Sequence, residues 1–230
     1  MSARLLVDLL RDPSGAALLD VWAWNGVISA ARAERLLGTL AVWLEGIGVP
    51  PEVNSILAEA KLDAEIDTYR DMINDRQLEG SLALLKKLLH REEATASGRI
   101  LFRIKANIGA AHLNLGHEVP ATDWLLAAYD HAPMEPKAIA NKALAHLLRG
   151  EWDEVLRMGR ENLTSEAADD SLSSHVIQAA RFAGITLRGR TRLMYLTTAV
   201  PGMSSSRKVP SASAATVMKE IRVPCSSRLP

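Results

Sequence analysis

The sequence predicts an all-α fold made of antiparallel helix pairs, and three observations lead to it. Of the 230 residues, Ala contributes 34 and Leu 33, whereas Phe, Tyr and Trp together contribute ten, a composition that favours packed helices over sheets. No run of alternating apolar and polar residues has the length of a strand. Gly116, Gly150 and Gly184 stand 34 residues apart, and each follows an apolar helical segment, so we expect one helix pair per period.

The first 50 residues predict a small group of helices without a clear repeat. Apolar residues recur at helical spacing over residues 3–10 and again over residues 16–24, on either side of a turn at residues 12–15. Ser29 is a candidate N-cap for a helix of about four turns that ends at Gly46. We therefore expect residues 1–50 to form an N-terminal helical cap.

Longer helices are predicted after the double proline at position 50. Pro51 suits a first helical turn, and that helix should run to about Asn74. Leucines at helical spacing predict another helix over residues 77–90, followed by a polar loop and a further helix that begins near Arg99. From there, helix and turn alternate to the end of the repeats. Turns are expected near Gly116, Pro133, Gly150, residues 164–170 and Gly184.

Several other residues obey the same 34-residue offset. It pairs Arg103 with Lys137, Asn107 with Asn141, and His112 with His146. Small and large apolar residues alternate along the helices of one unit in the way that close helix packing requires. That unit resembles the tetratricopeptide repeat (TPR). The resemblance is carried by Ile108, Gly109, His112, Leu115, Gly116, Ala121, Leu125, Ala128 and Pro133.

The resemblance implies a right-handed superhelix of helix pairs over residues 51–201, and it is clearest over residues 101–167. A second unit, residues 139–167, keeps Gly150 and Trp152 but is a degenerate copy. Outer units over residues 62–89 and 172–201 keep less of the pattern. In such arrays each helix pair leaves an apolar side that its neighbour covers, so an end repeat makes self-association a plausible property of the chain.

Tetratricopeptide proteins hold a partner's peptide in a concave groove lined by the first helix of each pair, and the resemblance implies the same here. Recurring Asn side chains can donate to and accept from the backbone of an extended peptide, and basic side chains can attract its carboxylates or phosphates. The competing interpretation is that the basic residues are ordinary solvated surface. The predicted groove residues are Arg103, Asn107, Lys137, Asn141, His175 and Arg181.

The sequence gives no positive sign of catalysis, of a metal or of a cofactor. It contains no phosphate-binding glycine loop and no nucleophile motif, and its histidines lack metal-ligand spacing. His112 and His146 are expected to be packing residues. Adjacent carboxylates such as Asp169 and Asp170 are expected to cap helices. The Trp residues at positions 22, 24 and 43 are expected to fill the core of the cap, with an exposed partner surface as the alternative.

Charge is distributed unevenly along the chain. Residues 1–184 carry 19 basic and 26 acidic side chains, whereas residues 185–230 carry 8 basic and 1 acidic side chain. Residues 202–230, rich in Ser and Pro, are expected to be a disordered basic tail. A lone Cys225, the lack of a secretory segment and the lack of a long apolar run favour a cytoplasmic protein without a membrane span.

Taken together, these patterns predict a non-enzymatic scaffold or adaptor that binds an extended peptide of a partner protein. Two alternatives stay open. The chain could be the substrate-recruiting TPR region of a larger, truncated transferase. It could also be a nucleic-acid-associated regulator that uses its basic tail, with an ordinary solvated tail as the competing interpretation of those residues.

Overall fold

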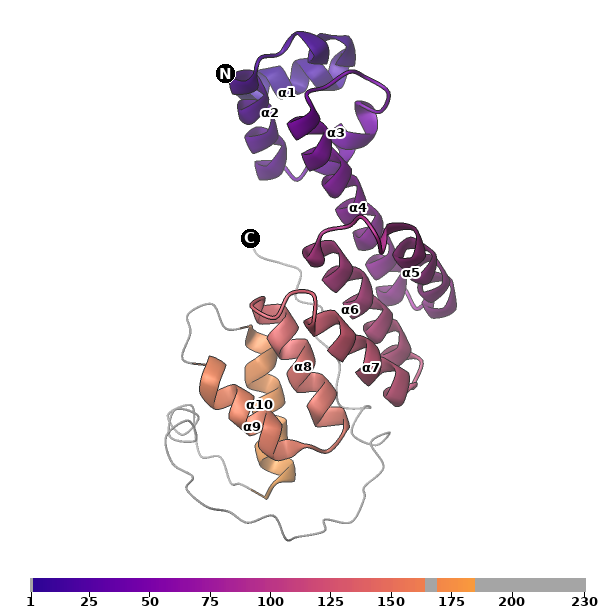
Figure 1. The fold of residues 1–230 in the computed structure, drawn as a ribbon, viewed down its shortest axis with the longest axis vertical. Coiled ribbons are helices and arrows are strands. Elements are labelled where there is room, and N and C mark those ends of the chain that lie inside the picture. The colour runs from indigo at the N-terminus through magenta and orange to yellow at the C-terminus, as the bar shows by residue number, and fades with distance from the viewer. Residues whose placement is uncertain (1, 164–168, 185–230) are drawn as a thin grey trace. The chain divides into compact units, whose positions relative to one another are not determined.

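The computed structural model describes residues 2–163 and 169–184, and these residues form helices without any strand (Figure 1). The chain divides into two compact units, Met1–Ala111 and His112–Pro230, which are described separately. The elements are α1 (Ser2–Arg11), η1 (Pro13–Leu18), α2 (Val21–Ala33), α3 (Leu37–Trp43), α4 (Pro51–Asn74), α5 (Leu78–Glu92), α6 (Gly98–Asn114), α7 (Glu118–Tyr129), α8 (Pro136–Leu148), α9 (Trp152–Asn162) and α10 (Asp170–Phe182). The prediction of an all-α fold is confirmed for the described residues.

The helices of the N-terminal cap differ from the predicted ones at two points. Residues 13–18 form a short 3-10 helix, and α2 begins only after Asp20, whose carboxylate accepts a hydrogen bond from the backbone N–H of Ala23. The predicted start at Ser29 is wrong, because Ser29 lies inside α2. The chain turns at Arg35, so the expected four-turn helix is split between α2 and α3.

The three tryptophans of this region have different environments. Trp24 is 1% exposed and lies in the core of the cap with Val27 and Leu40. Trp22, by contrast, is 84% exposed and Trp43 is 50% exposed. The core-filling interpretation is therefore confirmed for Trp24 and wrong for Trp22, because the two residues lie about 200° apart around α2 and only one of those sides faces the core.

The second unit is built around α8, which contacts α7, α9 and α10. Small residues allow these helices to approach closely. A Cβ atom placed on Gly159 of α9 would lie 2.5 Å from a methyl carbon of Val176 on α10, so the α9–α10 contact requires glycine at this position. Ala140, Ala143 and their neighbours are fully buried in the same core. Here the predicted alternation of small and large residues produces tight helix packing.

One type of turn closes five of the helices that the structure describes. Gly116, Gly150 and Gly184 have φ angles of 78°, 74° and 73°, in the left-handed region that glycine adopts at low cost. Arg35 and Arg76, with φ of 57° and 65°, occupy the corresponding positions after α2 and α4. The predicted turns at the three glycines are confirmed, as is the predicted break between Asn74 and residue 77, and the structure adds the turn at Arg35.

The same two backbone hydrogen bonds close four of these turns. After α8, the N–H of Gly150 donates to the carbonyl of Leu147 at 3.1 Å, and the N–H of Glu151 donates to the carbonyl of His146 at 3.0 Å. This pair of bonds is the Schellman motif, which satisfies carbonyls left open at a helix end. Equivalent bonds close α2, α4 and α6. These four helices, α2, α4, α6 and α8, therefore end in the same way, whether arginine or glycine takes the left-handed position.

None of the described helices combines the length and the apolar character that a bilayer span requires. Three predictions fall outside the described residues. They are the part of the third repeat beyond Gly184, the basic tail of residues 202–230, and the role of Cys225.

Candidate binding face on α8 and α10

In the first unit, Arg103 is engaged by carboxylates of the unit itself. Its guanidinium donates to Asp63 and, at 2.6 Å, to Asp67, both on α4. One turn earlier on α6, Arg99 pairs with Asp63 at 2.6 Å and with Glu59 at 3.0 Å. We call these five residues the α4–α6 ladder. Each arginine of the ladder is paired with two carboxylates, so Arg103 offers no uncompensated positive charge to a ligand.

Asn107 also forms a hydrogen bond within its own helix. Its side-chain Nδ2 donates to the carbonyl of Arg103 at 2.8 Å, one turn back along α6. Such local bonds compete with contacts to other molecules. The two predicted groove residues of the first unit are thus both committed to bonds within that unit.

In the second unit, Lys137 links the starts of α8 and α10. Its Nζ lies 3.6 Å from a carboxylate oxygen of Asp169 and 3.5 Å from the Oγ of Ser171. Asp169 is the N-cap of α10 and accepts a hydrogen bond from the backbone N–H of Ser171 at 2.8 Å, as predicted for this carboxylate. Burial raises the pKa of Asp169, but the bonds from Ser171 and the nearby Lys137 outweigh it and hold the pKa below its ordinary value.

Asn141 and His175 follow one turn further along α8 and α10. The Lys137–Ser171 contact joins residues 34 apart, and the α8 and α10 helices contact each other along their length (Figure 1). The same offset therefore brings Asn141 of α8 into register with His175 of α10. Both side chains are half-buried. The structure thus brings together Lys137 and His175 of the six predicted residues, and the helix register places Asn141 beside them.

His175 is an uncharged imidazole at neutral pH. Its pKa is lowered to about 4, chiefly by burial; the nearby Asp169 acts in the opposite direction, and Lys137 adds to the lowering. Its Nδ1 is buried and has no hydrogen-bond partner among the described residues. A neutral ring has one N–H donor and one acceptor nitrogen, so His175 can form a directional hydrogen bond without carrying charge.

Gln178 is a polar residue of this face that the sequence reasoning missed. It lies one turn beyond His175 on α10, is half-buried, and its Oε1 is buried without a hydrogen-bond partner in the described structure. The 34-residue offset relates it to Leu144, so no repeating polar residue marked the position. The α8–α10 face consists of Lys137, Asn141, Ser171, His175 and Gln178.

Arg181 does not belong to this face. It is exposed and lies six residues after His175, which places it about 120° further around α10. The offset relates it to Leu147, which is buried. The prediction grouped Arg181 with His175 because both lie on the same helix, without considering which side of that helix each residue occupies.

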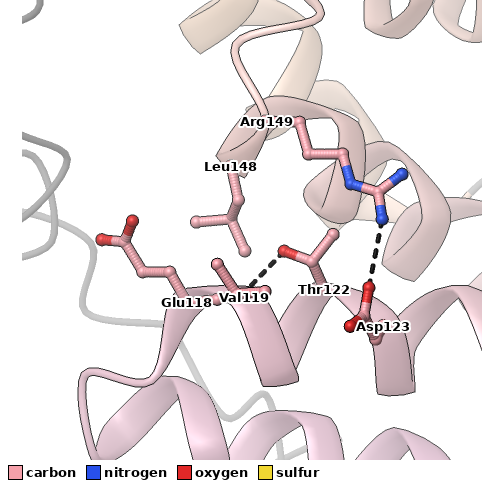
Figure 2. Close-up of a pocket in the computed structure, with 6 residues that line it drawn as sticks. All are labelled: Glu118, Val119, Thr122, Asp123, Leu148 and Arg149. Atoms are coloured by element: carbon pink, nitrogen blue, oxygen red, sulfur yellow. Dashed lines mark hydrogen bonds and ion pairs between the residues drawn. The ribbon is translucent and has the colours of Figure 1, made fainter.

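A separate shallow pocket lies between the start of α7 and the end of α8 (Figure 2). Its volume is about 170 Å³, below the roughly 300 Å³ at which small-molecule sites begin. Within it, Thr122 donates to the carbonyl of Glu118 at 2.8 Å, and Arg149 pairs with Asp123 at 3.2 Å (Figure 2). The Thr122 hydroxyl and the Arg149–Asp123 pair are therefore already engaged within the chain. The pocket is lined by Glu118, Val119, Thr122, Asp123, Leu148 and Arg149.

His112 and His146, one period apart, each contact a side chain on the far side of the turn that follows their helix. His112 is buried, as its packing interpretation predicts, and its Nδ1 lies 3.4 Å from the Nδ1 of His117. One period later, the Nδ1 of His146 contacts the carboxylate of Glu151. Each pair spans a left-handed glycine. In the described residues, no three His, Cys, Asp or Glu side chains are grouped so that they could hold a metal ion.

Comparison with models of protein families, with curated proteins and with solved structures gives no match to this chain. The geometry of the α8–α10 face is therefore the basis for a functional assignment.

Proposed function

We propose that the protein is a non-enzymatic, cytoplasmic adaptor of tetratricopeptide-like helix pairs, and that its α8–α10 face binds an extended segment of a partner protein. Peptide contacts are assigned to Lys137, Asn141 and His175. Arg103 and Asn107 are assigned to the stability of the first unit instead, because both are already hydrogen-bonded there.

The observation that carries the proposal is the unsatisfied polar character of the α8–α10 face. Two neighbouring side chains on α10 have buried polar atoms without a partner in the described structure, whereas buried polar atoms in proteins are nearly always paired. Across the contact, Asn141 supplies an amide that can donate and accept. The Lys137 side chain, which is 52% exposed, and the amide of Asn141 offer hydrogen bonds along the helices, which suits the repeating backbone of an extended peptide.

The proposal is tested with a peptide selected from a random dodecapeptide display library on the full chain. Asn141→Ala should weaken binding of that peptide by about tenfold, the effect of one lost hydrogen bond in a desolvated site. Fluorescence anisotropy with the labelled peptide measures the affinity.

Asn107→Ala is the matched control, because it makes the same chemical change one period earlier on α6. It should leave the affinity unchanged, and Arg181→Ala should do the same. A library that yields no binder, or a selected peptide that Asn141→Ala does not affect, would refute the proposed function.

A further inference from the structure

Two histidine rings meet across the turn between α6 and α7. His112 lies in the last turn of α6, and His117 is the N-cap residue of α7. Their Nδ1 atoms lie 3.4 Å apart, and the centroids of the two rings lie 5.6 Å apart. Sequence spacing did not mark this pair, because two metal-binding histidines on one helix face are four residues apart and these are five apart.

The backbone of the turn fixes the separation of the two residues. The N–H of His117 donates to the carbonyl of His112 at 2.9 Å, and Gly116 between them has a φ angle of 78°. These features belong to the Schellman motif that closes α6. The two residues therefore cannot move apart unless the turn opens, and little conformational entropy is lost when both rings bind one ligand.

Helix capping does not account for the side chain of His117. The N-cap position is ordinarily held by Ser, Thr, Asp or Asn, whose side chains accept a backbone hydrogen bond, but the His117 side chain forms no such bond. Burial does not account for it either, since His117 is exposed. Its ring instead contacts the ring of the buried His112. A ligand can approach this contact from the side of His117.

We propose that Nδ1 of His112 and Nδ1 of His117 bind one Zn²⁺ ion, with water in the two other positions of a tetrahedral site. A Zn–N bond is about 2.0–2.1 Å long, so two nitrogens on a tetrahedral ion lie about 3.4 Å apart. The two Nδ1 atoms have this separation before any ion is bound. Imidazole nitrogen is also a ligand that suits zinc.

The corresponding pair one period later shows what the second histidine adds. There the Nδ1 of His146 contacts the carboxylate of Glu151. An imidazole N–H and a carboxylate satisfy each other as donor and acceptor. Two neutral imidazoles that meet at Nδ1 have only one proton between them, whereas zinc accepts a lone pair from each ring. Zinc binding therefore requires both rings as Nε2–H tautomers and replaces the contact between the two Nδ1 atoms.

Isothermal titration calorimetry of the full chain with zinc chloride tests the site. All variants carry Cys225→Ser, which removes the thiol as a competing ligand. One Zn²⁺ should bind per chain with a Kd of about 1–100 µM, weaker than a structural site with four protein ligands. His117→Asn should weaken this binding by at least about tenfold, and α7 should keep its start because Asn is a favoured N-cap.

Glu151→Asn is the matched control, because Glu151 is the N-cap of α9 and occupies the position of His117 one period later. It should leave the zinc affinity unchanged. Zinc should also raise the urea midpoint of unfolding, and this rise should disappear in His117→Asn, because only the folded turn holds both nitrogens together.

The ligating atoms are identified by ¹⁵N NMR of the histidine rings. Zinc should shift the Nδ1 resonances of His112 and His117, and Nε2 of both rings should carry the proton. No binding up to about 1 mM zinc, an equal loss in His117→Asn and Glu151→Asn, or ligation through Nε2 would refute the inference. The site lies apart from the α8–α10 face, so this result and the peptide result can fail independently.

Discussion

The α4–α6 ladder and the α8–α10 face differ in how the polar side chains between two helices are paired. In each unit a first helix lies beside the next first helix, with polar side chains along the seam. In the ladder, Arg99 and Arg103 reach three carboxylates of α4, and each carboxylate has an arginine partner. On the α8–α10 face, Lys137 forms two long contacts, with Asp169 and Ser171, and two polar atoms beyond it have no partner in the described structure. The first seam is completed by its own charges, whereas the second keeps polar atoms without a partner among the described residues.

Acid should affect the α8–α10 face more strongly than the ladder, and this is the largest effect we expect. The folded pKa of His175, about 4, lies below the ordinary value of 6.5 because the ring is buried. As the pH falls below 6.5 the unfolded chain takes up this proton first, so the group removes stability progressively between pH 6.5 and pH 4. The loss should reach about 2 kcal/mol by pH 5. Urea unfolding at pH 7, 6 and 5 measures it.

His175→Gln should remove this part of the pH dependence, because the new side chain does not titrate. His90→Gln, an exposed change on α5, is the control and should leave the slope as it is. An unchanged slope in His175→Gln would show that other groups, such as carboxylates, account for the acid sensitivity.

A substitution at the tightly packed Gly159 should disrupt the α8–α10 face and leave the ladder intact. The added methyl of Gly159→Ala would meet Val176 at 2.5 Å and 3.2 Å, so α10 has to shift, at a cost of about 1–3 kcal/mol. Peptide binding should fall with it. Adding Val176→Ala should restore part of both losses, and urea unfolding and anisotropy report the two effects.

Gly80→Ala is a matched control on α5, where the new methyl would lie 3.5 Å from the end of the flexible Met72 side chain. It should stabilise the protein by about 0.5–1 kcal/mol, since alanine is the better helix former. If Gly159→Ala were equally harmless, the α9–α10 contact would be looser than its geometry indicates.

The helices and the glycine turns of the second unit could be predicted, whereas the ladder could not. Glycine at a helix end is a signal that a sequence shows directly, but Arg35 and Arg76 carry the same turn without any such signal. Turns at residues 35, 76 and 116 are spaced by 41 and 40 residues, so the 34-residue offset breaks down before Gly116. The ladder follows the longer spacing, with Arg103 40 residues after Asp63.

The candidate site was predicted in part for a similar reason. Asn141 and His175 follow the 34-residue offset and could be found from it. Gln178 could not, because an unpaired atom is a property of the packed structure and leaves no mark on the sequence. The offset also matched Arg103 to Lys137 correctly by position, but it carries no information about the carboxylates that engage Arg103 in space.

Loss of one ladder carboxylate should destabilise the first unit and leave peptide binding unchanged. Asp63→Asn keeps the size of the side chain but removes the charge that faces both Arg99 and Arg103. Because these groups are partly shielded from solvent, we expect a loss of about 1–2 kcal/mol in urea unfolding. Lys137→Met on the other seam should cost less than about 0.5 kcal/mol, since its side chain is 52% exposed.

Asp71→Asn is the control for Asp63→Asn, because Asp71 is 62% exposed and pairs only with its neighbour Arg70 in the described structure. It should change stability by less than about 0.5 kcal/mol. Equal effects of the two changes would mean that the ladder is an ordinary set of surface ion pairs.

The smallest effect concerns the turns themselves. Arg35 holds a left-handed conformation that costs a residue with a Cβ about 1–2 kcal/mol, and glycine avoids this cost while losing about 0.5–1 kcal/mol of backbone entropy. Arg35→Gly should therefore stabilise the protein by about 0.5–1 kcal/mol in urea unfolding. Arg32→Gly, the same change inside α2, should destabilise it by a similar amount. If both changes lower the free energy of unfolding, the Arg35 side chain stabilises the turn by more than its left-handed backbone costs. The arginine turns of the first unit and the glycine turns of the second would then be stabilised in different ways.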